Sequence, residues 1–500
     1  MALIEALPAC LTCKRAYRLA IARVASLASC QSFTHLRWLC EYYLSSDPFT
    51  GVTRAKYLED LIIHATTFQR ELNGAEPSQS PAQLIGELLV HAQNIRRLAL
   101  DRFHPLVKTE AKISLAFSSM HRLAQIRFSK VADGSLNVLQ RIGNPKRLTL
   151  AYLVYENDLR DGCRSLPPLL ATLASFPNLH TVMLWKFKPW DPEDSAPLPP
   201  LPSVRYLLLS QASVQALDMV ERCPNLSTLV FSVDVDIADD TTNAGLSWRP
   251  LRRVMLASRR EGVYVRDHLS TVSLLQVSGK LGLSWEPEVS GFLDLLRIAS
   301  PIGLYFGFYV TRLDWWSGED NDQMTRQLLD MLSNIPLSVL KILVPPTPSP
   351  SRKNSADYYR RELAKAKVKE KERMVAMAAL PRLLVDAIPS LCYLSVADMA
   401  PNTALTDDTP DGSDTGDSSD DYDDSESGVR PDGWDDLREI GRIGKQMWWK
   451  IVEEEGQRVM VEISEDEGER AKREVELQDD EEMLRIEGEC VPSPPLRAGC

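Results

Sequence analysis

The 500-residue sequence lacks a long hydrophobic run, a catalytic motif and a metal-ligating cluster. Its longest wholly apolar stretch, Pro301–Val310, is far shorter than the roughly 20 residues that a membrane span needs. The N-terminus has no basic segment ahead of an apolar one, so we expect no signal peptide and no membrane partner. None of the seven histidines belongs to a ligand-spaced pair, and no nucleophile elbow or phosphate-binding loop is present. These absences favour a non-enzymatic protein with no catalytic residue, metal or cofactor.

Paired cysteines are also missing. The nine cysteines are odd in number and scattered, which is typical of a protein from a reducing compartment, the cytoplasm or the nucleus. Cys10 and Cys13 form a C-x-x-C, but no second Cys/His pair follows at the distance of a zinc finger. We interpret both as structural residues.

Positive charge is scarce in one part of the chain only. Residues 401–500 contain 30 acidic and 11 basic residues, a net charge of −19, whereas residues 1–400 have a net charge of +7. A mildly basic body with an acidic tail is typical of chains that carry a solvated interaction tail. A charge of +7 over 400 residues, without an aromatic-basic motif, makes nucleic acid an unlikely partner.

A short apolar sequence motif, x-L-x-x-L-x-L, recurs along the chain and is called the apolar phrase below. It is usually preceded by Pro or Asn. Its central positions are Leu98, Ile126, Leu148, Val182, Leu207, Leu229, Val254 and Leu275. They are 28, 22, 34, 25, 22, 25 and 21 residues apart, and leucine-rich repeats have periods of about 20–29 residues. Looser copies follow at Ile335–Ile342 and Ile388–Val396. The pattern predicts an α/β leucine-rich-repeat solenoid, an irregular horseshoe.

A single repeat cannot be stable by itself. Burying three or four aliphatic side chains contributes roughly 1.5–3 kcal/mol each, whereas ordering 20–30 residues costs about 1–2 kcal/mol per residue. Neighbouring repeats must therefore stack and share their apolar rows. Alternation of strands and helices also permits an ordinary α/β domain with parallel strands, so that alternative stays open.

The segment Ala6–Ile21, ALPACLTCKRAYRLAI, resembles the second half of an F-box. Ser32–Pro48 and Ala55–Ala65 resemble the entry to the repeats in fungal F-box-like leucine-rich-repeat proteins, an intracellular class. The first F-box helix has no counterpart before Leu7-Pro8, so the resemblance implies a truncated or degenerate F-box. It also implies that residues 1–30 contact a Skp-type adaptor, through Leu11, Tyr17 and Leu19.

In a leucine-rich solenoid the strands line the concave face, and the residues between the core leucines point outward. Arginine, tyrosine and methionine are enriched at protein interfaces. We therefore predict a protein substrate on the concave face, bound by the following residues: Arg97, Arg127, Arg147, Tyr206 and Arg253.

Composition divides the chain into four parts. Residues 1–30 are the F-box-like helical segment, and 31–400 are the solenoid, with a charged insertion at 345–380. The charged run in this insertion predicts a helix with a solvated face, although a nuclear-localisation or nucleic-acid role is an alternative. Residues 401–433 are predicted to be a disordered acidic linker, because they have almost no apolar side chains. Residues 434–490 predict a hairpin, anchored by Trp448 or Trp449, and an acidic helix over Glu465–Ile486.

Two functions fit these observations. The resemblance implies a substrate-recognition subunit of a cullin–RING ubiquitin ligase. The residues alone fit a leucine-rich-repeat scaffold without ligase attachment, whose acidic tail regulates binding or covers the concave face. A hydrolase or transferase would need a site assembled from distant repeats.

Overall fold

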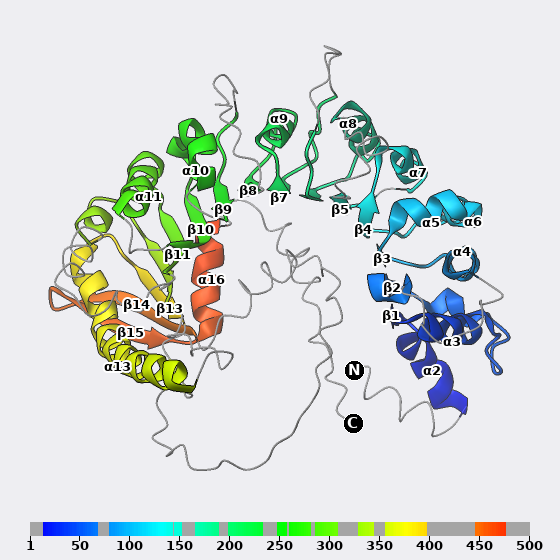
Figure 1. The fold of residues 1–500 in the computed structure, drawn as a ribbon, viewed down its shortest axis with the longest axis horizontal. Coiled ribbons are helices and arrows are strands. Elements are labelled where there is room, and N and C mark those ends of the chain that lie inside the picture. The colour runs from blue at the N-terminus through cyan, green and yellow to red at the C-terminus, as the bar shows by residue number, and fades with distance from the viewer. Residues whose placement is uncertain are drawn as a thin grey trace. The chain divides into compact units, whose positions relative to one another are not determined.

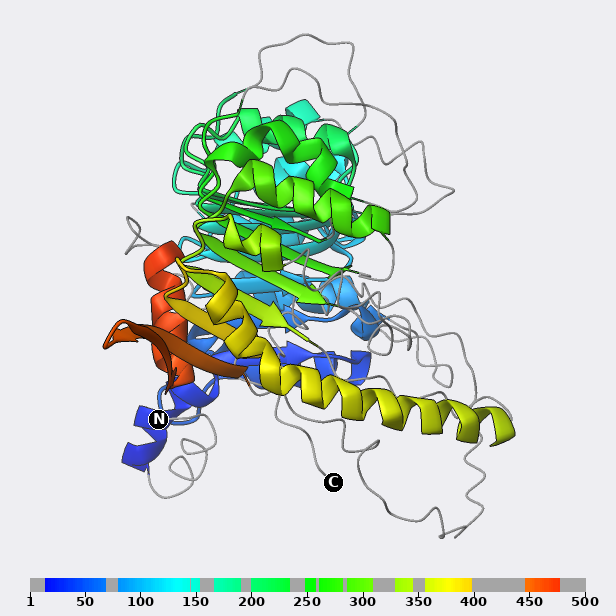
Figure 2. The ribbon, with the colours of Figure 1, turned by 90° about the vertical axis from the view of Figure 1, so that its left-hand side faces the viewer.

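A computed structural model describes residues 14–68, 80–143, 145–152, 166–189, 199–233, 248–257, 260–281, 286–308, 329–344, 356–397 and 446–476. The chain divides into two compact units, Met1–Arg249 and Pro250–Cys500, and each is described by itself. In both, a sheet of mainly parallel strands carries helices along one face (Figures 1 and 2). The predicted α/β class is confirmed.

The sheet of the first unit runs in the order of the chain. Its described strands are β1 (Leu27–Cys30), β2 (Asp60–Ile63), β3 (Arg97–Leu100), β4 (Gln125–Val131), β5 (Arg147–Tyr152), β6 (Thr181–Trp185), β7 (Tyr206–Ala212) and β8 (Thr228–Val233). Each strand pairs in parallel with the next. Parallel neighbours need a crossover connection, and here each crossover joins two strands that follow one another in the chain.

The apolar phrase sets the register of this sheet. Its central residues pair directly across β3–β8, in the following row: Leu98, Ile126, Leu148, Val182, Leu207 and Leu229. None of the six is more than 2% exposed. The prediction that these residues lie on neighbouring strands and share one interior is therefore confirmed.

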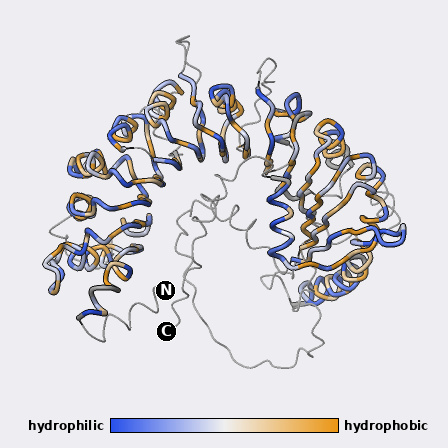
Figure 3. The backbone as a smooth tube through the Cα atoms, turned by 180° about the vertical axis from the view of Figure 1, so that it is seen from behind, coloured by the Kyte–Doolittle hydropathy of each residue, from blue (hydrophilic) through white to orange (hydrophobic). Residues whose placement is uncertain are grey.

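Helices cover the face of the sheet to which this row points (Figure 1). They are α3 (Phe33–Leu44), α4 (Pro81–His91), α5 (Phe103–Thr109), α6 (Ala111–Phe117), α7 (Leu136–Leu139), α8 (Leu166–Ala174) and α9 (Asp218–Glu221), with the 3-10 turns η1 (Arg54–Tyr57), η2 (Ala65–Phe68), η3 (Asp133–Ser135) and η4 (Val214–Leu217). Apolar residues recur along the strands and on the helices (Figure 3). Phe103 of α5, for example, stacks on Phe128 of β4 with 4.1 Å between ring centroids.

The N-terminal segment is only partly helical. Helix α2 (Lys14–Val24) agrees with the prediction for residues 1–30, but β1 (Leu27–Cys30) follows it and pairs with β2. The prediction of a wholly helical segment is therefore wrong at its end. The physical reason is that Ala28 and Cys30 are buried and begin the two rows of strand residues that face the helices.

The second unit continues the same construction. Its strands are β9 (Arg253–Leu256), β10 (Leu274–Leu281), β11 (Gly303–Phe308), β12 (Val339–Leu343), β13 (Tyr393–Ala397), β14 (Gln446–Glu454) and β15 (Gln457–Ile463). The strands β9–β13 pair in parallel and in chain order, whereas β14 and β15 add to the β13 edge as an antiparallel hairpin. The helical elements are α10 (Arg260–Val265), η5 (Arg266–Thr271), α11 (Glu286–Ala299), α13 (Ala356–Ala387) and α16 (Glu465–Glu476).

The charged insertion forms part of a single long helix, α13, which connects β12 to β13 (Figure 2). The predicted helix with a solvated face is confirmed, since Asp357, Arg360, Arg361 and Lys365 are exposed. Two charged residues of this helix are exceptions. Glu370 and Arg373 are both fully buried and form an ion pair, with Arg373 Nη2 2.6 Å from Glu370 Oε1. Arg373 Nη1 also donates to the carbonyl of Val344, at 3.4 Å. Burial of this pair is tolerable because each charge has an opposite partner.

The predicted hairpin is confirmed. Its turn, Glu455-Gly456, has positive φ at both residues, 52° and 76°, as the tight turns of two-residue hairpins require. The acidic helix that follows begins at Glu465, as predicted, and is described as far as Glu476. The predicted linker at residues 401–433 lies outside the described residues, and so do Cys10 and Cys13.

Candidate functional site

The candidate interaction surfaces are the sheet faces opposite the helices, here called the open faces. On β3–β8 the open face of the first unit consists of two rows of strand residues. They are Arg97, Gln125, Arg147, Thr181, Tyr206 and Thr228 in one row, and Ala99, Arg127, Thr149, Met183, Leu208 and Val230 in the other. Alternation along each strand places these residues opposite the buried leucines.

Three of the predicted arginines lie on adjacent strands. Arg97, Arg127 and Arg147 belong to β3, β4 and β5, and neighbouring strands are about 4.8 Å apart. Arg97 forms an ion pair with Asp60 of β2, and its side chain remains 46% exposed. Arg147 contacts the sulfur of Met183 through Nη2 at 3.3 Å. The three residues form a basic patch, called the arginine patch below.

Farther along the same face, exposure falls. Met183, Leu208 and Val230 are 7%, 0% and 8% exposed, so the expectation that these outward positions face solvent is wrong. The three residues are in register on β6, β7 and β8, and adjacent side chains therefore pack laterally against one another. Tyr206, the fourth predicted residue of this unit, is half-buried.

Arg253, the fifth predicted residue, belongs to the second unit. It lies at the start of β9, is half-buried, and donates through Nη2 to Oε1 of Gln276, at 3.3 Å. It is therefore considered with the open face of the second unit.

The predicted adaptor residues are only partly described. Leu11 lies outside the described residues, and Leu19 belongs to α2 without a described side chain. Tyr17 is half-buried and bound within the chain. Its hydroxyl donates to Asp47 Oδ2 at 2.6 Å, and its ring meets Phe49 edge-on at 4.9 Å. Tyr17 thus ties α2 to the loop that follows α3.

Asp47 is the polar centre of that loop. It accepts hydrogen bonds from Tyr17 and from the backbone N–H groups of Phe49 and Thr50. Burial alone would raise the pKa of this carboxyl, but these hydrogen bonds outweigh burial and hold the pKa below its ordinary value. The ionised form of Asp47 is therefore the one that organises the attachment of α2.

The open face of the second unit is covered by the C-terminal elements of the same unit. Leu274, Tyr305 and Val339 form an apolar cluster with Trp448 of β14, and all four are at most 4% exposed. Figure 1 shows α16 on the face opposite α10 and α11. Of the two predicted anchors, Trp448 is therefore the one that packs on this face. Trp449, the next residue of β14, pairs with Leu394 of β13.

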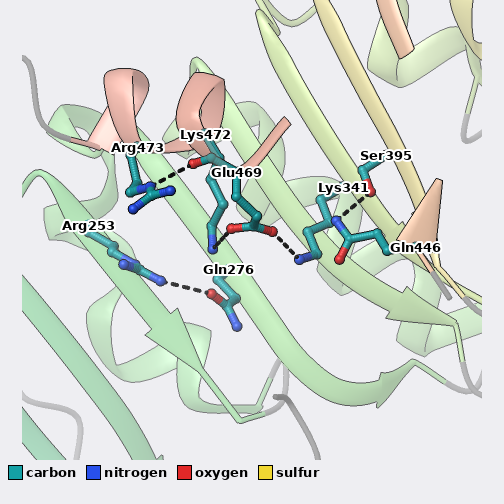
Figure 4. A network of polar contacts seen from close by, with 8 residues as sticks. All are labelled: Arg253, Gln276, Lys341, Ser395, Gln446, Glu469, Lys472 and Arg473. Atoms are coloured by element: carbon teal, nitrogen blue, oxygen red, sulfur yellow. Dashed lines mark hydrogen bonds and ion pairs between the residues drawn. The ribbon is translucent and has the colours of Figure 1, made fainter. Parts of the chain in front are cut away.

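Ion pairs cross this covered face (Figure 4). Glu469 of α16 lies between two lysines: Lys341 Nζ of β12 is 3.2 Å from Oε1, and Lys472 Nζ is 3.2 Å from Oε2. The lysines also lie over aromatic rings, Lys341 over Trp448 at 5.9 Å and Lys472 over Tyr305 at 5.4 Å. Such cation–π contacts strengthen when they are shielded from water.

Burial and neighbouring charges together shift the pKa values of Lys341 and Glu469. Burial lowers the pKa of Lys341 below its ordinary 10.5, although Glu469 opposes that fall. Burial would raise the pKa of Glu469, but Lys472 and Lys341 more than offset it and hold that pKa below 4.5. Glu469 is thus ionised at neutral pH.

Sequence reasoning found the tryptophan but not Lys341 or Glu469. Lys341 occupies an outward strand position like any solvated lysine, and Glu469 is one of many acids in its helix. A weak signal was present, because Gly468 and Ala471 are the small residues at a helical spacing of three.

The described residues offer little chemistry for catalysis or metal binding. Among them, no group of three or more His, Cys, Asp or Glu residues is placed to hold a metal ion. Of the described cysteines, Cys392 is exposed, whereas Cys30, Cys40 and Cys223 are buried. Burial raises the pKa of the Cys40 and Cys223 thiols to about 12. Nor does any helix in the described ranges have the length and apolar character to cross a membrane.

Comparison with known proteins found no family model that matches the chain and no curated protein that matches it significantly.

Proposed function

We propose that the chain is a leucine-rich-repeat protein that binds a protein partner through the open face of its first unit. The observation that carries this proposal is the unbroken register of Leu98, Ile126, Leu148, Val182, Leu207 and Leu229, one residue from each successive repeat. An array of this kind presents an extended sheet face, and repeat proteins use such faces for binding.

The arginine patch selects the kind of partner. Arg97, Arg127 and Arg147 concentrate positive charge on three adjacent strands, and Arg97 forms an ion pair with Asp60. Arginine binds carboxylates through paired hydrogen bonds. The partner should therefore present an acidic segment to β3–β5.

The test compares full-length proteins in a quantitative binding assay, with partners identified by site-specific crosslinking from β4. Replacing Arg127 and Arg147 by Glu should weaken capture at least about tenfold, since like charges would oppose the acidic segment. The matched control replaces two exposed arginines by Glu, Arg37 of α3 and Arg141 shortly after α7. Equal capture by both double variants would refute the proposal.

The more specific candidate is a substrate-recognition subunit of a cullin–RING ligase. It rests on the resemblance of Ala6–Ile21 to half of an F-box, and α2 supports it by its attachment to the first repeat. Ala20 and Ile21 are buried, and Tyr17 is tied to Asp47, so the helix has a fixed position on the first unit.

Co-purification with a Skp-type adaptor tests this candidate. Binding that is lost when Leu11 and Leu19 are replaced by Asp, but retained when the exposed Arg23 of α2 is replaced by Gln, would support the ligase role. Absence of adaptor binding would favour the alternative, a scaffold without ligase attachment.

A further inference from the structure

Helix α16 covers the open face of the second unit through a narrow contact. Of its described side-chain positions only Gly468 and Ala471 are buried, and Glu469 and Lys472 are partly exposed. The other charged residues of α16 whose side chains are described face solvent. Elements with few buried apolar contacts lie at the low-stability end of a structure and open locally.

The contact depends on one glycine. A Cβ atom at Gly468 would lie 2.2 Å from Cδ2 of Trp448, which is too close for two non-bonded carbon atoms. The backbone of α16 therefore lies directly against the indole ring. The indole Nε1 of Trp448 is buried and has no hydrogen-bond partner among the described residues. An unsatisfied buried donor is unfavourable, so α16 covers the tryptophan without satisfying it.

The hairpin that carries Trp448 is held much more firmly than α16. β14 pairs with β13 over five residues. Arg458 of β15 donates to the carbonyl of Val385 in α13 and to two carbonyls in the turn after it, at 2.8 Å to Ile388 and 2.7 Å to Leu391. These bonds satisfy orphan carbonyls at a helix C-terminus. The hairpin can therefore remain in place when α16 leaves.

With α16 absent, the surface would combine an aromatic and apolar floor with one cation. Trp448, Tyr305 and Leu274 form the floor, and Lys341 lies beside Trp448, with 13% of its side chain exposed while α16 is docked. Any helix that buries Lys341 in the same way must supply a carboxylate, because an uncompensated buried charge is strongly unfavourable.

We propose that α16 is a displaceable internal occupant of a docking site on the open face of the second unit, and that its external occupant is an acidic amphipathic helix of a partner protein. The partner helix places a small residue against Trp448 and, at the next position, a carboxylate against Lys341. This inference goes beyond the proposed function, which concerns the open face of the first unit.

The first experiment measures amide hydrogen exchange in the full-length protein. The Gly468→Leu substitution should accelerate exchange of the α16 amides by at least about tenfold while the amides of β14 and β15 keep their protection. The matched control is Glu474→Gln, at an exposed position of the same helix. Unchanged exchange of α16, or joint loss of protection in α16 and the hairpin, would overturn the proposal.

The second experiment adds a fluorescent peptide with the sequence of residues 464–478. The full-length Gly468→Leu variant should bind it at least about tenfold more tightly than the wild-type protein, in which α16 competes intramolecularly. A peptide carrying Glu469→Lys should not bind. Equal affinity of wild type and variant, no binding to the variant, or equal affinity for the Lys peptide would each overturn the proposal. None of these results bears on the arginine patch.

Discussion

The open faces of the two units are built from the same strand positions and have different surroundings. In the first unit the positions on β3–β5 carry arginines, with Arg97 46% exposed. In the second unit the equivalent positions on β10–β12 carry Leu274, Tyr305 and Lys341, and the chain covers them with its own hairpin and helix. The difference teaches that the repeat determines where a face lies, whereas the outward residues determine whether that face is open to a partner or closed by the chain.

The largest effect should follow removal of Trp448, the anchor of the hairpin that covers the open face of the second unit. Trp448→Ala deletes a side chain that is 1% exposed, and such truncations cost about 3–5 kcal/mol because they leave a cavity. The free energy of unfolding of the second unit, from urea denaturation, should fall by this amount. Trp38→Ala, at a position that is 66% exposed, is the control. Equal losses in both variants would remove the distinction between the faces.

A smaller effect should appear in the closed part of the first unit's face. Leu208 points away from the helices yet is fully buried, so Leu208→Ala should cost about 2–3 kcal/mol, the lower part of the range for buried leucines. Leu115→Ala, at a position that is 63% exposed on α6, should cost less than about 0.5 kcal/mol. Denaturant midpoints measure both. A loss at Leu208 no larger than at Leu115 would mean that this face is open throughout.

Acidification should weaken the docking of α16 on the open face of the second unit. The pKa of Glu469 is lowered when α16 is docked, so its contribution to docking is fully present above its ordinary 4.5 and is lost as pH falls through the docked value. The charged groups around this site are Lys341, Lys472 and Glu465, and Lys341 remains charged in this range. Hydrogen exchange of α16, corrected for intrinsic rates, should accelerate several-fold on acidification. The Glu469→Gln variant should lack this pH step, and a step of equal size in that variant would contradict the assignment.

The smallest effect should be seen in the arginine patch itself. The ion pair of Arg97 with Asp60 is partly exposed to solvent, and such pairs contribute about 0–1 kcal/mol. A double-mutant cycle of Arg97→Ala and Asp60→Ala should therefore give a coupling energy below about 1 kcal/mol. A coupling above about 2 kcal/mol would show that the pair holds the sheet together and is not available to a partner.

Much of the fold could be predicted because the central residues of successive copies of the apolar phrase indicate which positions pair across neighbouring strands. Leu98, Leu148, Leu207 and Leu229 lie in one row, as their spacing indicated. The strands β1 and β11 were missed. β1 (Leu27–Cys30) reads LASC and carries no leucine at its inward positions, and β11 (Gly303–Phe308) lies in a continuously apolar stretch without the phrase. A periodic signal cannot find repeats that do not keep the period.

The sequence by itself determined which residues form the interior, since alternation and a repeat of about 20–30 residues leave few other ways to bury so many leucines. It also determined the hairpin turn, because Glu455-Gly456 lies between two alternating segments. Only the tertiary structure decided that Lys341, Trp448 and Glu469 meet, because 128 residues separate Lys341 from Glu469 and no local pattern joins them. Contacts of this kind depend on where a segment docks, and docking is decided by shape and charge on surfaces that exist only after the strands have paired.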